Sequence, residues 1–269
     1  MSSAIDVVAG AVGDWLDEPR DGPLILGLCG AQGSGKSTLA QALEARFAAQ
    51  GARVAVLSLD DLYLGCAARA AVAHAIHPLF ATRGVPGTHD VAQGVALLDA
   101  IRAGESVMLP RFDKARDEPA PEGQPTLANL DLLIFEGWCI GAQAQDAATL
   151  APPVNALERD DDPDGVWRGH ANAALAGAYA ALFARIDRLV LLAAPGFEVV
   201  RGWRGQQEAA LRARVAGGEA QGAHVMDEAA LDRFVQHYER ITRHILAEMP
   251  GRADLVLPLA PDRSLRKPQ

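Results

Sequence analysis

A stretch of nine residues, 30–38, with the sequence GAQGSGKST, constrains this chain more than any other. It fits the pattern G-x-x-x-x-G-K-[ST], a loop that binds the phosphates of nucleoside triphosphates. Glycines let the backbone turn sharply and bring its N–H groups close to phosphate oxygens. Lys36 supplies a positive charge for the outer phosphates, and the Ser37 hydroxyl can ligate Mg²⁺. The residues expected to contact ATP are Gly30, Gln32, Gly33, Ser34, Gly35, Lys36, Ser37 and Thr38.

The segments on either side of this loop favour the same interpretation. Residues 24–29 form a short apolar run suited to a buried parallel strand. Residues 39–50 have apolar side chains at helical spacing and end before a glycine. A helix that starts directly after the loop points the positive end of its dipole at the phosphates. The chain has only three lysines, and one of them is Lys36.

The composition limits the class of protein. With 269 residues, 49% of them hydrophobic and 22% charged, the chain can bury the core of one globular α/β domain. A net charge of −9 gives no basic footprint for nucleic acid, so a small-molecule substrate is expected. No apolar run is long enough to cross a bilayer, and the N-terminus lacks the pattern of a signal peptide. The three cysteines form no C-x-x-C pair, which is typical of free thiols, and a cytoplasmic location is expected. The sequence does not fix the oligomeric state.

The order of predicted elements indicates an α/β fold. We expect the three-layer α/β/α sandwich of P-loop NTPases, with a mainly parallel central sheet, a helical lid and a C-terminal helix. A single domain is expected over residues 1–269, in which 1–22 form an N-terminal helix and linker and 196–222 form the lid. The predicted strands are 24–29, 53–59, 130–138, 188–193 and 255–257, with a short one at 107–110. The predicted helices are 3–18, 39–50, 67–80 interrupted at Pro78, 91–102, 167–185, 197–215, and a long one capped by Asp227 that stops at 250–251.

Two of the predicted strands end in acidic residues. Asp60 and Asp61 follow the second strand, and Glu136 closes the third. The carboxyl ends of parallel strands form the crevice in which open α/β sheets bind ligands. An aspartate here is also a common helix N-cap. Beside a phosphate loop, we expect Asp60 to accept the proton of a substrate hydroxyl and Glu136 to hold Mg²⁺ or its water. The expected metal ligands are Ser37, Asp60 and Glu136.

Two further loops carry groups that could bind an acceptor. Residues 83–90, RGVPGTHD, form a loop rich in Gly and Pro that also holds Arg, Thr, His and Asp. It is either an ordinary loop in which Asp90 caps the next helix, or a substrate-binding loop. Residues 111–117, RFDKARD, are either solvated surface or a contact for substrate or phosphate. The candidate acceptor-binding residues are Asp61, Tyr63, Arg83, His89, Asp90 and Lys114.

The predicted helix at 197–215 contains several arginines, among them Arg204. Such a helix is either an amphipathic surface helix or a lid whose arginines neutralise charge in the transition state. We therefore place Arg204 with Lys36, Asp60 and Glu136 as a candidate catalytic residue. The acidic run at 160–164 is expected to be solvated.

Several motifs together resemble the D-glycerate 3-kinase family, a branch of the P-loop kinases related to phosphoribulokinase, uridine kinase and bacterial pantothenate kinase. The resemblance implies the use of ATP and Mg²⁺ and phosphate transfer to the 3-hydroxyl of D-glycerate. It also implies that Asp60 is the base and Glu136 the metal-linked acid. The motifs run over most of the chain and are GAQGSGKST, SLDDLYL at 58–64, RGVPGTHD at 83–90, RFDKA at 111–115, FEGWCIG at 135–141, WRGHANAAL at 167–175 and WRGQQE at 203–208.

One departure from the family pattern concerns the substrate carboxylate. In the family, the FDK motif is often followed by a glycine- and arginine-rich stretch, but here ARDEPAPEG follows. If those arginines hold the carboxylate, its recognition falls here to Arg83, Lys114 or Arg116.

Other functions stay open at this point. The same fold could act on pantothenate, a nucleoside or another sugar acid, and a protein that binds ATP without turnover is a further alternative. A GTPase switch is disfavoured because the chain has no Asn-Lys pair for a guanine signature.

Overall fold

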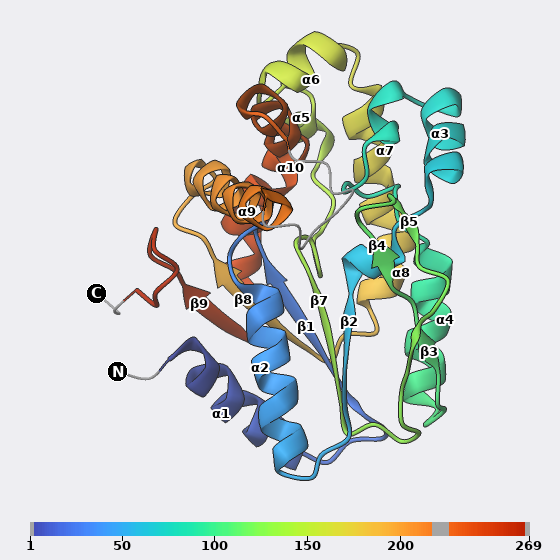
Figure 1. Ribbon diagram of the computed structural model, residues 1–269, viewed down its shortest axis with the longest axis vertical. Coiled ribbons are helices and arrows are strands. Elements are labelled where there is room, and N and C mark those ends of the chain that lie inside the picture. Colours follow the sequence, from blue (N-terminus) through green and yellow to red (C-terminus); the bar gives the residue numbers. More distant parts are fainter. Residues whose placement is uncertain (1–2, 217–225, 267–269) are drawn as a thin grey trace.

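The computed structural model describes residues 3–216 and 226–266. At its centre lies a five-stranded parallel sheet in the order β2-β7-β1-β8-β9 (Figure 1). This confirms the prediction of an α/β fold with a mainly parallel sheet and helices on both faces. The strands are β1 (Leu24–Gly30), β2 (Val54–Ser58), β7 (Leu132–Gly137), β8 (Arg188–Ala193) and β9 (Leu255–Pro258).

Alternate side chains of the strands enter two separate cores. In β1, Leu24, Leu26 and Leu28 face one side, whereas Ile25 and Cys29 face the other. Because both faces are covered, the strands read as continuous apolar runs in the sequence. The first face is covered by α1 (Ala4–Asp17), α2 (Lys36–Ala49) and α9 (Glu198–Ala216). The second is covered by α4 (Val91–Arg102), α8 (Ala180–Phe183) and part of α10 (Glu228–Glu248).

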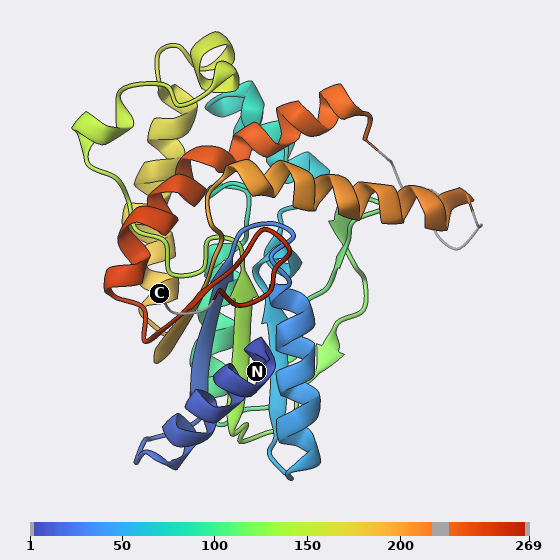
Figure 2. The ribbon, with the colours of Figure 1, turned by 90° about the vertical axis from the view of Figure 1, so that its left-hand side faces the viewer.

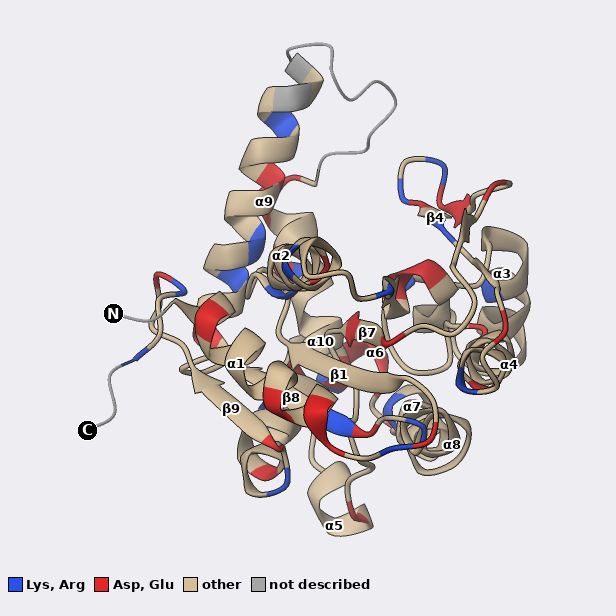
Figure 3. Cartoon of the chain, turned by 90° about the horizontal axis from the view of Figure 1, so that it is seen from below, with Lys and Arg blue, Asp and Glu red and all other residues tan. Residues whose placement is uncertain are grey.

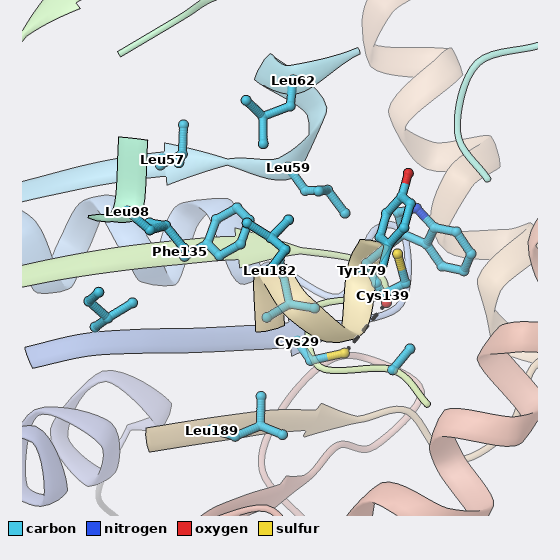
Figure 4. Packing of buried hydrophobic residues seen from close by; sticks show 14 of the residues in the cluster. Cys29, Leu57, Leu59, Leu62, Leu98, Phe135, Cys139, Tyr179, Leu182 and Leu189 are labelled. Carbon is cyan, nitrogen blue, oxygen red and sulfur yellow. Dashed lines mark hydrogen bonds between the residues drawn. The ribbon is translucent and has the colours of Figure 1, made fainter. Parts of the chain in front are cut away.

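The second core contains four buried aromatic side chains, Phe135, Trp138, Tyr179 and Tyr238. Figure 4 shows Phe135 of β7 between leucines from neighbouring elements, with Tyr179 and Cys139 close to the end of the sheet where the strands finish. Phe135, Leu57 and Leu98 are fully buried. The cysteines predicted to be free are free: Cys29 and Cys139 are buried and Cys66 is exposed. This packing fixes the positions of the strand ends that carry the candidate site.

The predicted helix at 167–185 is present but not uniform. It consists of α7 (Val166–Ala174), a π-helical turn (Leu175–Tyr179) and α8. The predicted helix at 67–80 is shorter than expected, because α3 (Cys66–Ala75) ends before Pro78 and a separate 3₁₀ turn (Pro78–Ala81) follows. A proline cannot continue the hydrogen bonding of a helix interior, which accounts for the break.

Two small hairpins lie outside the main sheet. The predicted strand at 107–110 is β3 (Met108–Leu109), which pairs with β6 (Gln124–Pro125). Between them, β4 (Phe112–Asp113) pairs with β5 (Glu118–Pro119). We call residues 112–119 the charged hairpin, because five of these eight residues are charged: Asp113, Lys114, Arg116, Asp117 and Glu118 (Figure 3). The hairpin contacts the 3₁₀ turn Leu59–Leu62 that follows β2.

The helices α9 and α10 cross above the carboxyl ends of the strands, directly over the loop after β1 (Figure 2). In α10, the apolar side chains of Leu231, Val235, Tyr238 and Ile241 are buried. Part of the predicted lid, residues 217–222, lies outside the described residues. Within the described ranges, no helix combines the length and the apolar composition that crossing a bilayer requires.

The acidic run at 160–164 is not entirely solvated as predicted, because Asp162 is buried. Its carboxylate accepts the backbone N–H groups of Trp167 and Arg168 at the start of α7, at 2.8 and 3.1 Å. It also pairs with the buried guanidinium of Arg168 at 3.0 Å. An aspartate that satisfies the free N–H groups of a helix start is stabilising, and this explains the burial.

A second buried ion pair joins the same region to α10. Glu158 of α6 (Ala156–Asp161) and Arg240 lie 2.6 Å apart, and their side chains are 0% and 6% exposed. The guanidinium of Arg240 also donates to two carbonyl oxygens, those of Thr149 and Pro152. Thr149 lies in the short helix α5 (Ala147–Leu150). Arg240 thus ties the segment 149–158 to α10.

This pair gives a stability prediction. Arg240→Ala leaves the Glu158 carboxylate buried without its partner, so the free energy of unfolding should fall by about 3–5 kcal/mol in urea denaturation. Arg243→Ala on the same helix is the control, because Arg243 is 46% exposed in its ion pairs and its loss should cost less than about 1 kcal/mol. Equal losses in the two variants would contradict the proposed importance of the buried pair.

Candidate active site

The loop after β1 has the conformation that phosphate binding needs. Gly33 and Gly35 have φ angles of +76° and +92°, and Lys36 begins α2. A Cβ at Gly33 would lie 2.6 Å from the Cβ of Trp203 on α9, so only glycine fits beneath that helix. The loop therefore combines left-handed backbone geometry with close packing against α9, and presents the N-terminus of α2 to an anion.

Three polar atoms around this loop are buried and have no hydrogen-bond partner among the described residues. They are Oε1 of Gln32, Oγ of Ser34 and Oε2 of Glu136. Buried polar atoms are nearly always paired in folded proteins, so such a group of unpaired oxygens beside a phosphate loop indicates a binding site. Their chemistry suits phosphate hydroxyls, ordered water and a hard cation.

Glu136 is placed by the register of the sheet. Its Cα pairs with Leu28 of β1 on one side and with Ser58 of β2 on the other. The Ser37 hydroxyl, on the first turn of α2, donates to Glu136 Oε1 at 2.8 Å. The two oxygen-bearing groups predicted from sequence to be metal ligands are therefore neighbours.

Asp60 lies just past the end of β2, in the 3₁₀ turn Leu59–Leu62. Its carboxylate accepts the Tyr63 hydroxyl at 2.9 Å and the Lys114 ammonium at 2.5 Å. Burial alone would raise the pKa of Asp60, but the charges of Lys114 and Lys36 and these two hydrogen bonds outweigh it. The pKa is held well below its ordinary value, and the carboxylate is ionised at neutral pH.

The charged hairpin is anchored beside Asp60 through Asp61. The Asp61 carboxylate pairs with the guanidinium of Arg111 at 2.9 Å and accepts the backbone N–H of Phe112 at 3.1 Å. The Phe112 ring packs edge-on against Tyr63, with centroids 5.4 Å apart. Asp61 thus positions the hairpin that brings Lys114 to Asp60.

The loop 83–90 is held tightly against the site. The Trp138 indole donates to the Gly84 carbonyl at 2.9 Å, and the Tyr238 hydroxyl donates to the Arg83 carbonyl at 3.1 Å. Gly84 has a φ of +139°, and a Cβ there would collide with the Tyr238 hydroxyl. The loop is therefore a rigid part of the site, and it directs the Arg83 guanidinium over the Phe112 ring at 5.6 Å.

His89 of this loop is buried and stacks on Tyr63, with ring centroids 4.6 Å apart. Its Nδ1 lies 2.6 Å from the Tyr179 hydroxyl, which accepts the Gly87 N–H. A Tyr179 hydrogen donated to Nδ1 leaves the imidazole hydrogen on Nε2, a buried atom without a partner among the described residues. Burial lowers the pKa of His89 to about 3, and the Asp60 charge only partly opposes this, so the ring is neutral.

Two candidates from the sequence are engaged elsewhere. The exposed Asp90 accepts the Gln93 N–H at 2.9 Å and caps α4, which is the local role already considered for it. Arg204 pairs with Glu208 at 2.5 Å within α9 and lies over the Phe234 ring at 5.4 Å. Arg204 directly follows Trp203, the residue that packs against Gly33 of the phosphate loop.

The structure adds residues that the sequence reasoning missed. Arg263, in the segment after β9, donates to the Gly33 carbonyl and to the Gln206 side chain, and stacks over Trp203 at 5.3 Å. No sequence signal links it to a loop 230 positions away. Arg69 and Asp117 also pair beside the site. Arg69 is the only residue of the Lys, Arg, Asp and Glu types in α3, and a single charge in an alanine-rich helix could have drawn attention.

Comparisons with known proteins agree with this geometry. A family model described as the methylmalonyl Co-A mutase-associated GTPase MeaB matches residues 19–63, the part that contains the phosphate loop. A D-glycerate 3-kinase from Cryptococcus neoformans has the same fold, with a TM-score of 0.78 and 22% identity over 99% of each chain. The protein YGR205w superposes equally well, with a TM-score of 0.78 over 99% of this chain and 98% of its own. The fold is that of a P-loop kinase.

Two curated relatives narrow the assignment. An uncharacterized kinase, mug58, of Schizosaccharomyces pombe is 34% identical over 251 residues, 88% of this chain and 87% of the relative. The chloroplastic D-glycerate 3-kinase of Arabidopsis thaliana is 28% identical over 258 residues, 90% of this chain but only 52% of the relative. The chain thus spans about half the length of that plant kinase. The protein belongs to the same kinase family as mug58, and it is similar to proteins named D-glycerate 3-kinase.

The buried His89 gives a prediction on pH. Its folded pKa of about 3 lies below the ordinary value of 6.5, so between these values the unfolded chain binds more protons and stability falls as the pH falls. Between pH 7 and pH 5 the wild type should lose about 2 kcal/mol more unfolding free energy than His89→Gln. The control His74→Gln replaces an exposed histidine and should keep the wild-type pH dependence. Parallel losses in wild type and His89→Gln would show that His89 titrates normally in the folded protein.

Proposed function

We propose that this kinase transfers the γ-phosphate of ATP to a hydroxyl of a small hydroxy acid, D-glycerate, giving 3-phosphoglycerate. The observation that carries the proposal is the placement of Asp60 between the phosphate-loop lysine and a set of cations on the acceptor side. Lys36 affects the pKa of Asp60 from one side, and Lys114 contacts it from the other. Arg83 and Arg111 lie close by on the same loops. Cations of this kind suit an acceptor that carries a carboxylate.

The names of the relatives support the same acceptor. The plant relative and the fungal structure are both called D-glycerate 3-kinase. A nucleoside would need an aromatic surface for its base and no carboxylate partner. The aromatic rings near Asp60 instead pack against one another, Tyr63 with His89 and with Phe112.

On the donor side, backbone N–H groups of residues 30–38 and the Lys36 ammonium would bind the phosphates. Trp203 presses α9 onto Gly33 and keeps this loop in place. In this proposal Arg204 turns from Glu208 toward the phosphates once ATP is bound, and neutralises charge there.

The residues present fit a bound Mg²⁺. In the described part of the chain, no group of three or more His, Cys, Asp or Glu side chains gathers to bind a metal. Mg²⁺ in phosphoryl-transfer sites takes only one or two protein ligands and completes its shell with phosphates and water. Ser37 and Glu136, with the unpaired Oε2, supply such a set, and Asp60 is a further candidate ligand. Bound Mg²⁺ would offset the negative charge of the phosphates.

In the reaction, the acceptor hydroxyl oxygen forms a bond to the γ-phosphorus, and the bond from that phosphorus to the β–γ bridging oxygen breaks as ADP leaves. The hydroxyl proton passes to the Asp60 carboxylate. Phosphoryl transfer has a loose transition state in which the hydroxyl stays protonated until late, so positioning matters more than base strength. A carboxylate with a low pKa can therefore serve, because its main task is to orient the hydroxyl.

The alternatives make different predictions. A related kinase could use pantothenate, a nucleoside or another sugar acid with the same donor site. A protein that binds ATP without turnover would need a damaged donor or base, whereas Lys36, Ser37, Asp60 and Glu136 are all present and adjacent.

The acceptor is tested by a panel of substrates. ADP production with Mg²⁺ and ATP should be stimulated by D-glycerate far more than by L-glycerate, pantothenate, uridine or ribulose 5-phosphate. Stimulation by another member of the panel alone would refute the D-glycerate assignment and retain the kinase. If no compound of the panel stimulates ADP production while calorimetry still detects ATP binding, the result would favour the alternative of a protein that binds ATP without turnover.

The role of Asp60 is tested separately. Asp60→Asn keeps the shape and an oxygen for Tyr63 but removes the charge, so kcat should fall by about 10²–10⁴ with ATP affinity retained. Asp99→Asn is the control, because Asp99 forms an exposed ion pair with Arg185 on the outside of α4 and should leave kcat unchanged. Near-normal turnover of Asp60→Asn would remove Asp60 as the proton acceptor.

A further inference from the structure

The Asp117 carboxylate is bound by two arginines at once. One oxygen pairs with the Arg83 guanidinium and the other with that of Arg69. Two arginines on the two oxygens of one carboxylate are an efficient way to recognise a carboxylate group. In this structure the protein supplies that carboxylate itself, from the charged hairpin.

Arg69 is buried, and its charge requires a counterion. Its side chain is 2% exposed, and its other nitrogen contacts are with the carbonyl oxygens of Leu64 and Ala81 and with the Cys66 sulfur. In residues 3–216 and 226–266, Asp117 is the one carboxylate that forms an ion pair with it. Leaving a buried charge without a partner is strongly destabilising. Asp117 can therefore leave Arg69 only when another anion takes its place.

The arginine pair lies beside the proposed acceptor site. The Arg83 guanidinium sits over the Phe112 ring, whose edge meets Tyr63, and the Tyr63 hydroxyl binds Asp60. The charge of Arg83 also affects the pKa of Tyr63. The rings of Tyr63 and Phe112 thus lie between Asp60, the proposed proton acceptor, and the guanidinium of Arg83.

The side chain that fills this pair is accessible and on a short element. Asp117 is 35% exposed, and Arg83 is 29% exposed. Asp117 lies in the tip of the charged hairpin, between the two strands that pair Asp113 with Glu118. Lys114 lies in the same tip and binds Asp60. The hairpin tip therefore contacts both groups: its Lys114 binds Asp60, and its Asp117 binds Arg69 and Arg83.

We propose that Arg69 and Arg83 are the receptor for the acceptor's carboxylate, and that Asp117 is an internal carboxylate which the acceptor displaces. The inference rests on the proposed function in taking the acceptor to be a hydroxy acid. Carboxylate recognition then falls to Arg83, one of the three candidates named from the sequence after the FDK motif, and to Arg69 as a second binding group. The other arrangement is that Asp117 neutralises the pair permanently and the substrate carboxylate binds Lys114 or Arg116.

The test removes the internal competitor. In Asp117→Ala, the KM and the calorimetric Kd for D-glycerate should fall by at least about three- to tenfold, because the partly exposed pair with Arg83 and the more buried pair with Arg69 no longer compete with the substrate. Asp117→Asn keeps the size and one acceptor oxygen, and should give a smaller fall without disturbing the fold. Adding Arg83→Gln to Asp117→Ala should abolish the gain. Glu122→Gln removes one exposed negative charge from the neighbouring loop and should change neither constant.

The outcomes separate the two proposals. An unchanged or higher Kd for D-glycerate in both Asp117 variants, with melting temperatures like that of the wild type, overturns the inference. An equal fall in Glu122→Gln also overturns it, because the effect would then come from general electrostatics. If the wild type does not phosphorylate D-glycerate, the proposed function fails. The carboxylate-receptor inference is then tested separately, by comparing the Kd for acetate of the wild type with that of Asp117→Asn. Tighter acetate binding in Asp117→Asn supports the receptor, and equal binding refutes it.

Discussion

The parallel register of β1, β7 and β2 is the constraint on which the candidate site depends. Glu136 pairs across the sheet with Leu28 and Ser58, so the acid at the end of β7 must lie between the phosphate loop and Asp60. The hydrogen bond from Ser37 to Glu136 closes this arrangement. Because both cores clamp the strands, a shift of one residue would turn the acid away from the loop. The donor half of the site is thus a consequence of strand pairing.

The acceptor half is built differently, from loops whose charges are paired with one another. Lys114 binds Asp60, Arg111 binds Asp61, and Arg83 binds Asp117. Each pair lowers the cost of holding charges in a partly buried place. Although the whole chain has a net charge of −9, three cationic side chains gather at the acceptor side: Arg83, Arg111 and Lys114.

The placement of the donor-side residues could be predicted from the sequence, and that of the acceptor-side residues only in outline. A phosphate loop, strand-end acids and apolar runs are local signals, and in a parallel sheet they converge on one edge, as Lys36, Ser37 and Glu136 do. Arg263 and Arg69 carry no local signal, since their partners Gly33 and Asp117 are distant in sequence and are found only by folding. The burial of Asp162 has a different cause: its acidic neighbours in sequence indicate solvent, whereas its carboxylate pairs with the buried Arg168 six residues further on.

The charged hairpin links recognition of the acceptor to the chemistry at Asp60. Its tip, between Asp113 and Glu118, is too short for Lys114 and Asp117 to move independently over more than a side chain's length. If a substrate carboxylate displaces Asp117, the same displacement draws Lys114 from Asp60 and leaves the Asp60 carboxylate free to orient the acceptor hydroxyl. Water has no carboxylate and leaves both contacts in place, so Asp60 stays bound to Lys114 and does not orient an attacking water. The arrangement would favour transfer to the acid over hydrolysis of ATP, because the group that identifies the acceptor also frees the base.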